Sequence, residues 1–256
     1  MATKNYLMSI AYDGRDFSGY QYQEGLRTVQ GEVEAVLEHI FKHPISSKAS
    51  GRTDAGVHAL DQVMAFEARD IMELDRLAYV VTRFLPRDIK LNWIKYSEIH
   101  PRFDALAKAY RYRLSFKDEL FKRPYSLYIK KKLDIDAMKE AAQALEGTKD
   151  FFNFSNRRTG EGSTVRTIYR IVFIESKEGL DLIFIGDGFL YKMVRIMVEY
   201  LINVGLDKYP ASRTSEVIKK KDRLETRQVA APEALFLERV FYDSHELNEY
   251  LDHLQI

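Results

Sequence analysis

Two hydrophobic periodicities replace each other along the first hundred residues, and their order is the feature that most constrains the fold. Strand patterns cover residues 6–12, 46–50, 62–68 and 89–93. Apolar residues at helical spacing cover 28–41 and 74–84, and Pro44 and Pro86 follow these two stretches. The order is therefore strand, helix, strand, strand, helix, strand, which is typical of an α+β domain.

A break at residues 100–101, where a proline follows a histidine, predicts a domain junction. Beyond it the same kinds of element recur with longer loops. The patterns predict a strand over 108–114, a helix over 135–145, a hairpin over 163–187, an apolar helix over 189–204, a short basic helix over 212–223 and a last strand over 235–242. We expect two α+β domains, residues 1–104 and 105–256, and the first resembles a ferredoxin-like unit.

Composition excludes several classes of protein. The 256 residues include no cysteine, which excludes disulfides, thiolate nucleophiles and zinc held by cysteine. The six histidines form no cluster at metal-ligand spacing, so we expect no metal site. No apolar run approaches the roughly 20 residues that span a bilayer, and the first residues lack the apolar core of a signal peptide. We expect a cytoplasmic protein without a membrane segment.

Charge is unevenly distributed although the net charge is only +1. The basic segment, residues 108–132, holds nine Lys or Arg against two acids, whereas residues 233–252 hold six acids against one arginine. A segregated basic face can bind nucleic acid without a basic total. A run of charges is also compatible with a face that is merely solvated.

The stretch 51–58, with the sequence GRTDAGVH, places Asp54 between two glycines. Glycine tolerates positive φ and lets another backbone or a ligand come close, so the pattern predicts an open loop that presents a carboxylate; a polar turn is the alternative. Residues 17–23 (FSGYQYQ) interleave rings with Gln21 and Gln23, which suits base recognition or an ordinary hydrogen-bonded loop.

A lone carboxylate such as Asp54 acts in enzymes as a nucleophile or a base. Paired-carboxylate chemistry needs a second acid, for which Asp61 and Asp13 are the candidates. Arg195 lies within an apolar helix pattern, so it either pairs with an acid or reaches out to solvent. His58 is expected to be a structural histidine rather than a catalyst.

Four separated motifs closely resemble those of the bacterial tRNA pseudouridine synthase A family, in the same order and over nearly the whole chain. The matching stretches are YDG at 12–14 with Phe17 and GYQYQ at 19–23, GRTDAGVHA at 51–59, KAYRY at 108–112, and Phe189 with MVR at 193–195. The resemblance implies an enzyme that isomerises uridine to pseudouridine in RNA without a cofactor or metal. It implies Asp54 as the nucleophile, Tyr110 lying over the uracil, Arg195 paired with Asp54, and Arg52 helping to displace the target base.

The family also implies a pseudouridine synthase fold, with two ferredoxin-like-related domains whose antiparallel or mixed sheets join around a central basic cleft. It implies a homodimer whose partner is tRNA, modified at positions 38, 39 and 40 of the anticodon stem-loop. We expect further RNA contacts from seven residues: Gln21, Gln23, Arg111, Arg157, Arg158, Arg166 and Lys192.

Two positions depart from the family pattern, which commonly has glycine where this chain has Glu199 and Ala234. Glu199 lies four residues after Arg195, at the helical spacing that would let it pair with that guanidinium and compete with Asp54. These departures leave open a divergent paralogue that acts on another tRNA or ribosomal RNA uridine. A non-catalytic RNA-binding protein on the same scaffold is the further alternative.

Overall fold

The computed structural model describes residues 3–156, 162–220 and 222–254, which form two compact units. Unit 1 comprises the chain up to Leu106 together with Phe236–Glu249, and unit 2 comprises Ala107–Leu235 and the described residues from Tyr250 on. The division falls close to the predicted boundary after residue 104. The predicted second domain nevertheless loses 236–249 to unit 1, because strand β10 (Leu235–Phe241) runs parallel to β3 (His58–Arg69) and pairs with it.

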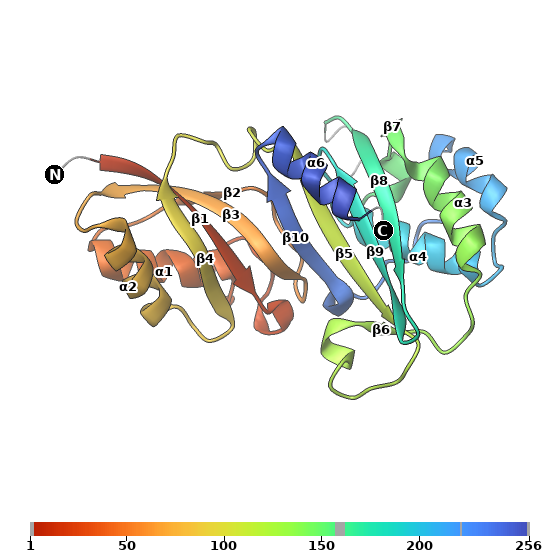
Figure 1. Cartoon of the computed structure of the whole chain (residues 1–256), viewed down its shortest axis with the longest axis horizontal. Helices are drawn as coiled ribbons and strands as arrows, with labels where there is room; N and C mark the ends of the chain where they lie inside the picture. The colour runs from red at the N-terminus through yellow and green to blue at the C-terminus, as the bar shows by residue number, and fades with distance from the viewer. Residues whose placement is uncertain (1–2, 157–161, 221, 255–256) are drawn as a thin grey trace. The chain divides into compact units, whose positions relative to one another are not determined.

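Unit 1 contains a mixed sheet in which β1 (Thr3–Tyr12) pairs antiparallel with both β3 and β4 (Ile89–Tyr96). The short β2 (Ser47–Ala49) pairs antiparallel with β3 at Met64–Phe66, whereas β10 meets β3 at His58–Ala59. Its helices are α1 (Val29–Phe41) and α2 (Leu74–Phe84), together with the first part of α6 (Ser244–His253). The predicted order of strand, helix, strand, strand, helix, strand is thus confirmed (Figure 1).

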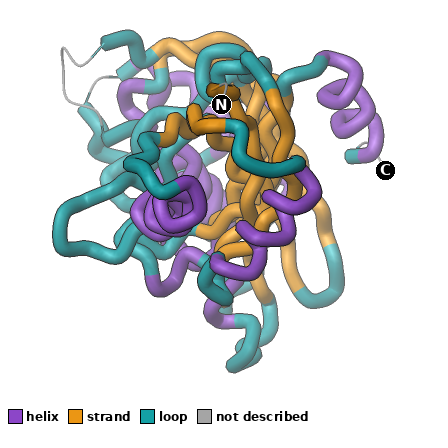
Figure 2. Tube along the Cα trace, turned by 90° about the vertical axis from the view of Figure 1, so that its left-hand side faces the viewer, coloured by secondary structure: helices purple, strands orange, loops and turns teal. Residues whose placement is uncertain are grey.

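The core of unit 1 lies between α1 and the sheet. Thr28 caps α1, since its Oγ1 accepts a hydrogen bond from the Gly31 amide at 3.2 Å. Tyr6 of β1 stacks on Phe66 at 5.0 Å between ring centroids and meets Phe41 of α1 at 5.7 Å. Figure 2 shows the chain from the side of this unit, with strands in orange and helices in purple.

In unit 2 the strands follow the antiparallel order β5 (Ala107–Ser115), β9 (Gly179–Gly186), β8 (Val165–Glu175) and β7 (Gly147–Asp150). The two-residue β6 (Leu127–Tyr128) pairs in parallel with the end of β5. The helices α3 (Ile135–Leu145), α4 (Met193–Gly205) and α5 (Thr214–Lys219) pack together, with α3 in contact with both others (Figure 1). Both units therefore combine a sheet with helices, as an α+β chain should.

Helix α4 is the most buried helix of unit 2. Every residue of α4 except Arg195 and Glu199 is buried. Its last residue, Gly205, leaves no room for a side chain, since a Cβ there would lie 2.7 Å from Sδ of Met138 in α3. Within the described ranges, no helix is long and apolar enough to cross a membrane.

The largest errors in the predicted boundaries concern three elements. Helix α4 begins at Met193 rather than at 189, because Lys192 adopts a left-handed backbone with φ of 61° that a right-handed helix cannot continue through. Strand β3 begins at His58 rather than at 62, because its first two residues pair with β10. Helix α5 covers only 214–219 of the predicted 212–223.

Candidate active site

The Asp54 loop, residues 50–57, connects β2 to β3 in unit 1 and is held by hydrogen bonds from its own unit. The amide of Tyr20 donates to the carbonyl of Thr53 at 3.1 Å, and the amide of Val57 donates to the carbonyl of Asp54 at 3.2 Å. The hydroxyls of Tyr12 and Thr53 form a buried hydrogen bond of 2.8 Å. Asp54 itself is half-buried. The residue before the carboxylate is therefore fixed through both its backbone and its side chain.

Two glycines allow another backbone to lie directly against this loop. A Cβ on Gly14 would come within 2.0 Å of the Val57 carbonyl oxygen, so no larger residue fits there. Gly56, two residues after Asp54, has a φ of 78°, a left-handed conformation that favours glycine. The sequence prediction of a glycine-dependent loop is confirmed at Gly56.

The base of the loop contains buried polar groups that we did not predict. Gln62 of β3 is fully buried, and its Nε2 donates to the Gly51 carbonyl at 2.6 Å while its Oε1 accepts from the Ser50 hydroxyl at 3.2 Å. Buried amides are normally bonded in this way, because an unsatisfied one is costly. An amide within an otherwise apolar strand pattern was the signal available in the sequence.

His58 is a structural residue, as predicted. Its ring is 2% exposed and stacks on Phe236 of β10 at 4.6 Å between centroids. The Gly14 amide donates to Nδ1 at 3.1 Å. The same ring nitrogen lies 3.3 Å from a carboxylate oxygen of Asp13.

Both candidates for a second catalytic carboxylate are occupied by structural contacts. Asp61 accepts hydrogen bonds from the Ser9 hydroxyl and, at 3.2 Å, from the Val240 amide. Asp13 forms an ion pair with Arg15 at 2.6 Å and accepts from the Arg15 amide at the start of a short helical turn. Asp54 is the carboxylate of this region that lies on the glycine-containing loop itself.

The other predicted residues of unit 1 lie at the surface. Gln21, Gln23 and Arg52 are exposed, and Nε2 of Gln23 donates to the Ser18 carbonyl at 2.9 Å. The loop that carries the two glutamines is joined to the Asp54 loop through the bond from Tyr20 to Thr53. Unit 1 therefore brings Gln21, Gln23, Arg52 and Asp54 into one connected region.

In unit 2, β5 alternates as predicted, with Tyr110 and Tyr112 buried and Arg111 and Arg113 half-buried. The ring of Tyr110 is 8% exposed and meets Phe189 edge to face, with 5.1 Å between centroids. Tyr112 is fully buried and its hydroxyl donates to the Ala231 carbonyl at 2.9 Å. Burial raises the pKa of Tyr112, and the charge of Glu233 adds to this, so the hydroxyl stays protonated.

Arg195 is oriented by a segment that carried no sequence signal. Its Nε donates to the Ala230 carbonyl at 2.7 Å, and the Ala230 amide donates back to the Arg195 carbonyl at 3.2 Å. Every residue has a backbone carbonyl, so the sequence does not indicate which one accepts a hydrogen bond. The role of Ala230 was therefore not predictable. Glu199, one helical turn further along α4, accepts a hydrogen bond from Asn203 at 3.4 Å.

The remaining predicted RNA contacts in unit 2 have different surroundings. Arg111 forms an ion pair of 2.7 Å with Asp181 on the neighbouring strand. Arg166 donates to the Ser163 and Val165 carbonyls, and Lys192 lies 5.1 Å from the ring centroid of Tyr191. Arg157 and Arg158 lie outside the described residues. Asp54 belongs to unit 1 and Tyr110 and Arg195 to unit 2, so the predicted pairing of Asp54 with Arg195 stays a prediction.

Ala234, the second departure from the family pattern, is fully buried in a short 3-10 turn just before β10. Among the residues that the structure describes, Ala234 is not one with a positive φ, so its backbone conformation is open to any residue. Glycine is therefore not required there.

Comparison with known proteins gives matches that extend over both units. The model of a family described as "tRNA pseudouridine synthase" matches residues 8–104 and 141–243. A protein named "tRNA pseudouridine synthase A" from Geobacillus sp. (strain WCH70) is 40% identical over 247 residues, which cover 94% of this chain and 100% of that protein. A protein of the same name from Exiguobacterium sp. (strain ATCC BAA-1283 / AT1b) is 38% identical, and the match covers 91% of this chain and 96% of that protein. Another of that name from Staphylococcus aureus (strain bovine RF122 / ET3-1) is 36% identical, and the match covers 94% of this chain and 92% of that protein.

Proposed function

The chain belongs to the tRNA pseudouridine synthase family and is an isomerase of tRNA uridines, and from this premise we propose that it acts on positions 38, 39 and 40 of the anticodon stem-loop with Asp54 as the nucleophile. The observation that carries the proposal is the position of Asp54 in the structure. Asp54 is a half-buried carboxylate on a loop that is fixed by buried hydrogen bonds and contains a glycine with positive φ two residues later.

In this mechanism the carboxylate of Asp54 attacks and the N1–C1′ bond of the uridine breaks. The freed uracil turns in the pocket and its C5 attacks C1′, which breaks the bond between C1′ and the Asp54 carboxylate and releases the carboxylate. The proton on C5 is then removed and N1 is left protonated. One carbon–nitrogen bond is exchanged for one carbon–carbon bond, and the formula of the nucleoside is unchanged. The chain therefore needs no oxidant, reductant or further reactant.

Three residues assist Asp54 in the proposal. A uracil within a stem must leave its stack before C1′ can be reached, which costs a few kcal/mol. Arg52, exposed two residues before Asp54, displaces the target base. Tyr110 lies over the flipped uracil and helps to remove the C5 proton, and Arg195, held by Ala230, balances the charge of Asp54.

We place the RNA-binding surface on basic residues of both units, across a basic cleft in a cytoplasmic homodimer. The basic segment, Arg166 and Lys192 would contact phosphates, together with Arg157 and Arg158, while Gln21 and Gln23 would meet bases. Phosphate contacts position an RNA without reading its sequence, and they make affinity fall with salt. Binding of tRNA should therefore weaken steeply as the salt concentration rises.

The decisive experiment replaces the nucleophile by its neutral isostere, Asp54→Asn. We expect turnover to fall by at least about a thousandfold, because a residue that forms the covalent intermediate has no substitute, while tRNA affinity changes by no more than about threefold. Asp16→Asn, which alters an exposed carboxylate of the same unit, is the control and should keep normal turnover.

The readout is chemical labelling of pseudouridine in tRNA treated with the purified protein, followed by mapping of the labelled positions. Normal product formation by Asp54→Asn would rule out this nucleophile. A wild-type protein that binds tRNA but forms no pseudouridine would be a non-catalytic RNA-binding protein. Product at positions other than 38, 39 and 40 would identify a divergent paralogue.

The role of Tyr110 is tested by separating its ring from its hydroxyl. A base stacked on an aromatic ring gains about 1–3 kcal/mol, so Tyr110→Ala should weaken binding of the target RNA by tenfold or more, whereas Tyr110→Phe should change it little. Turnover of Tyr110→Phe should fall if the hydroxyl helps to remove the C5 proton. Equal losses of affinity in the two variants would contradict stacking.

A further inference from the structure

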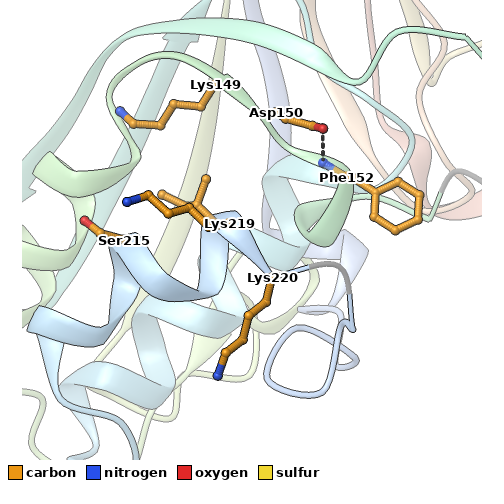
Figure 3. Close-up of a pocket in the computed structure, with 7 residues that line it drawn as sticks. Lys149, Asp150, Phe152, Ser215, Lys219 and Lys220 are labelled. Atoms are coloured by element: carbon orange, nitrogen blue, oxygen red, sulfur yellow. Dashed lines mark hydrogen bonds between the residues drawn. The ribbon is translucent and has the colours of Figure 1, made fainter.

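Unit 2 contains a pocket of about 350 Å³ that none of the residues assigned to the reaction lines. It lies between β7, the following turn and α5 (Figure 3). The lining residues are Lys149, Asp150, Phe152, Ser215, Ile218, Lys219 and Lys220. Three lysines around one pocket are an unusual concentration of positive charge, and the question is which of them already has an anionic partner.

One of the three lysines is neutralised by a carboxylate of the chain. Lys220 forms an ion pair with Glu216 at 2.7 Å, one helical turn away, and this contact raises its pKa. For Lys149 and Lys219, no ion pair exists among the described residues. Figure 3 shows the ammonium groups of Lys149 and Lys219 on the same side as the Ser215 hydroxyl, whereas the ammonium of Lys220 points away from them.

The carboxylate that lines the pocket is directed away from these two lysines. Asp150 accepts a hydrogen bond from the Phe152 amide at 3.0 Å and another from the Thr164 hydroxyl. In Figure 3 its oxygen lies on the opposite side from the ammonium groups of Lys149 and Lys219. Asp150 therefore stabilises its own turn through hydrogen bonds rather than binding the two lysines.

Lys149 holds its charge in a partly desolvated position. Burial lowers the pKa of Lys149, and the charge of Glu146 opposes this shift without cancelling it. The positive charge of Lys219 is favourable at its position without a ligand, because Lys219 is the last residue of α5 and cations are stabilised at the C-terminal end of a helix. Lys149 comes from β7 and has no such explanation. An anion between Lys149 and Lys219 would relieve the desolvation of the first and bridge the two elements.

We propose that this pocket binds a phosphate group of the tRNA backbone, at a site separate from the active-site residues. Two ammonium groups and a hydroxyl offer donors to several phosphate oxygens and none to a particular base. The contact is therefore independent of sequence and serves to position the RNA. The inference rests on the proposed function only in taking tRNA as the polyanion.

The first test measures tRNA affinity over a range of salt concentrations for Lys149→Gln, Lys219→Gln and the double variant. Each single change should raise Kd by about three- to tenfold and lower the slope of log affinity against log salt by about 1. Lys139→Gln is the matched control, because it removes one lysine charge from an exposed residue of the same unit that is paired with Glu175. A folded double variant, verified by its melting temperature, that binds like wild type would overturn the proposal.

The second test locates the phosphate and identifies its source. Acetylation of lysines is mapped by mass spectrometry on the Asp54→Asn protein, alone, with tRNA, or with inorganic phosphate at equal ionic strength. Protection of Lys149 and Lys219 by tRNA, but not of Lys139, supports the site. Equal protection by inorganic phosphate would overturn the assignment to RNA. Pseudouridine formation by the wild-type protein is scored separately, so failure of the pocket and failure of the proposed function give different results.

Discussion

The Asp54 loop and the loop 116–126 of the basic segment are both assigned to the RNA, yet opposite kinds of interaction hold them. The Asp54 loop is fixed by buried hydrogen bonds and by backbones that approach each other at glycine. The loop 116–126 is held by exposed ion pairs, in which Glu178 binds Lys117 and Lys122 at 3.0 Å and Asp118 binds Arg123 at 2.8 Å. It presents Phe121 to solvent with 88% of the residue exposed.

The difference follows from how precisely each loop must position its functional residue in the proposed function. A nucleophile has to be held within a fraction of an ångström of the reacting atom, and only close-packed, water-excluded contacts provide that precision. A residue that binds phosphate acts through a charge whose field extends several ångströms, so a looser support suffices. Perturbing the first loop should therefore cost far more stability and activity than perturbing the second.

The largest effect is expected from Gly14→Ala. A methyl group there would lie 2.0 Å from the Val57 carbonyl oxygen, so the two backbones must separate. We expect a loss of about 3 kcal/mol of unfolding free energy, as for an overpacked core, together with loss of turnover. Gly25→Ala is the control, since its Cβ would meet nothing within 4 Å and only its φ of 74° is strained; about 1 kcal/mol is expected there. Equal losses in urea unfolding of the two variants would contradict the tight contact.

A smaller effect is expected from Tyr12→Phe, which removes the buried hydrogen bond to Thr53 and leaves the ring in place. Stability should fall by about 1 kcal/mol, the usual value for a lost hydrogen bond, and turnover should fall because Thr53 precedes the nucleophile. Tyr242→Phe removes a comparable bond to the Pro101 carbonyl elsewhere in unit 1 and should lose stability alone. If both variants kept the same turnover, the bond to Thr53 would be irrelevant to catalysis.

The smallest effect is expected from Glu178→Gln in the loop 116–126. The ammonium groups of Lys117 and Lys122 lower the pKa of Glu178 from 4.5 to about 2. A lowered pKa means that the carboxylate stabilises the folded state above pH 4.5 and that this contribution is lost as the pH falls through about 2. Melting temperatures of wild type and variant should differ slightly at pH 7, less in high salt, and not at all near pH 2. A difference that grows on acidification would contradict the ion pairs.

The sequence predicted the helices of unit 1 better than the edges of unit 2, for local reasons. Helix α2 has its predicted bounds of 74–84 because an amphipathic pattern ends at a proline. The start of α4 was wrong because the left-handed turn at Lys192 is imposed by tertiary structure on a residue that does not favour it. Strand β7 and helix α6 were missed because the first has four residues and the second buries none.

The candidate site was predictable where side chains carry the chemistry and unpredictable where the backbone does. Asp54 stands out in the sequence because glycines flank it, and Arg195 stands out as a charge in an apolar helix. The carbonyls of Ala230 and Ala231, which orient Arg195 and Tyr112, are invisible in a list of side chains. The buried Gln62 lies between these cases. Its sequence signal is a polar amide within an apolar strand pattern, which does not show that its partners lie in the Asp54 loop.

The return of β10 to unit 1 has a consequence for the order in which the protein matures on the ribosome. Asp54 is synthesised within the first quarter of the chain, but Phe236, against which His58 stacks, emerges only after residues 107–235 have been made. Domains generally fold as they leave the ribosome. Here the unit that begins first is completed only near the end of the chain, so a nascent or truncated chain that lacks its final twenty-one residues carries Asp54 on an unfinished sheet.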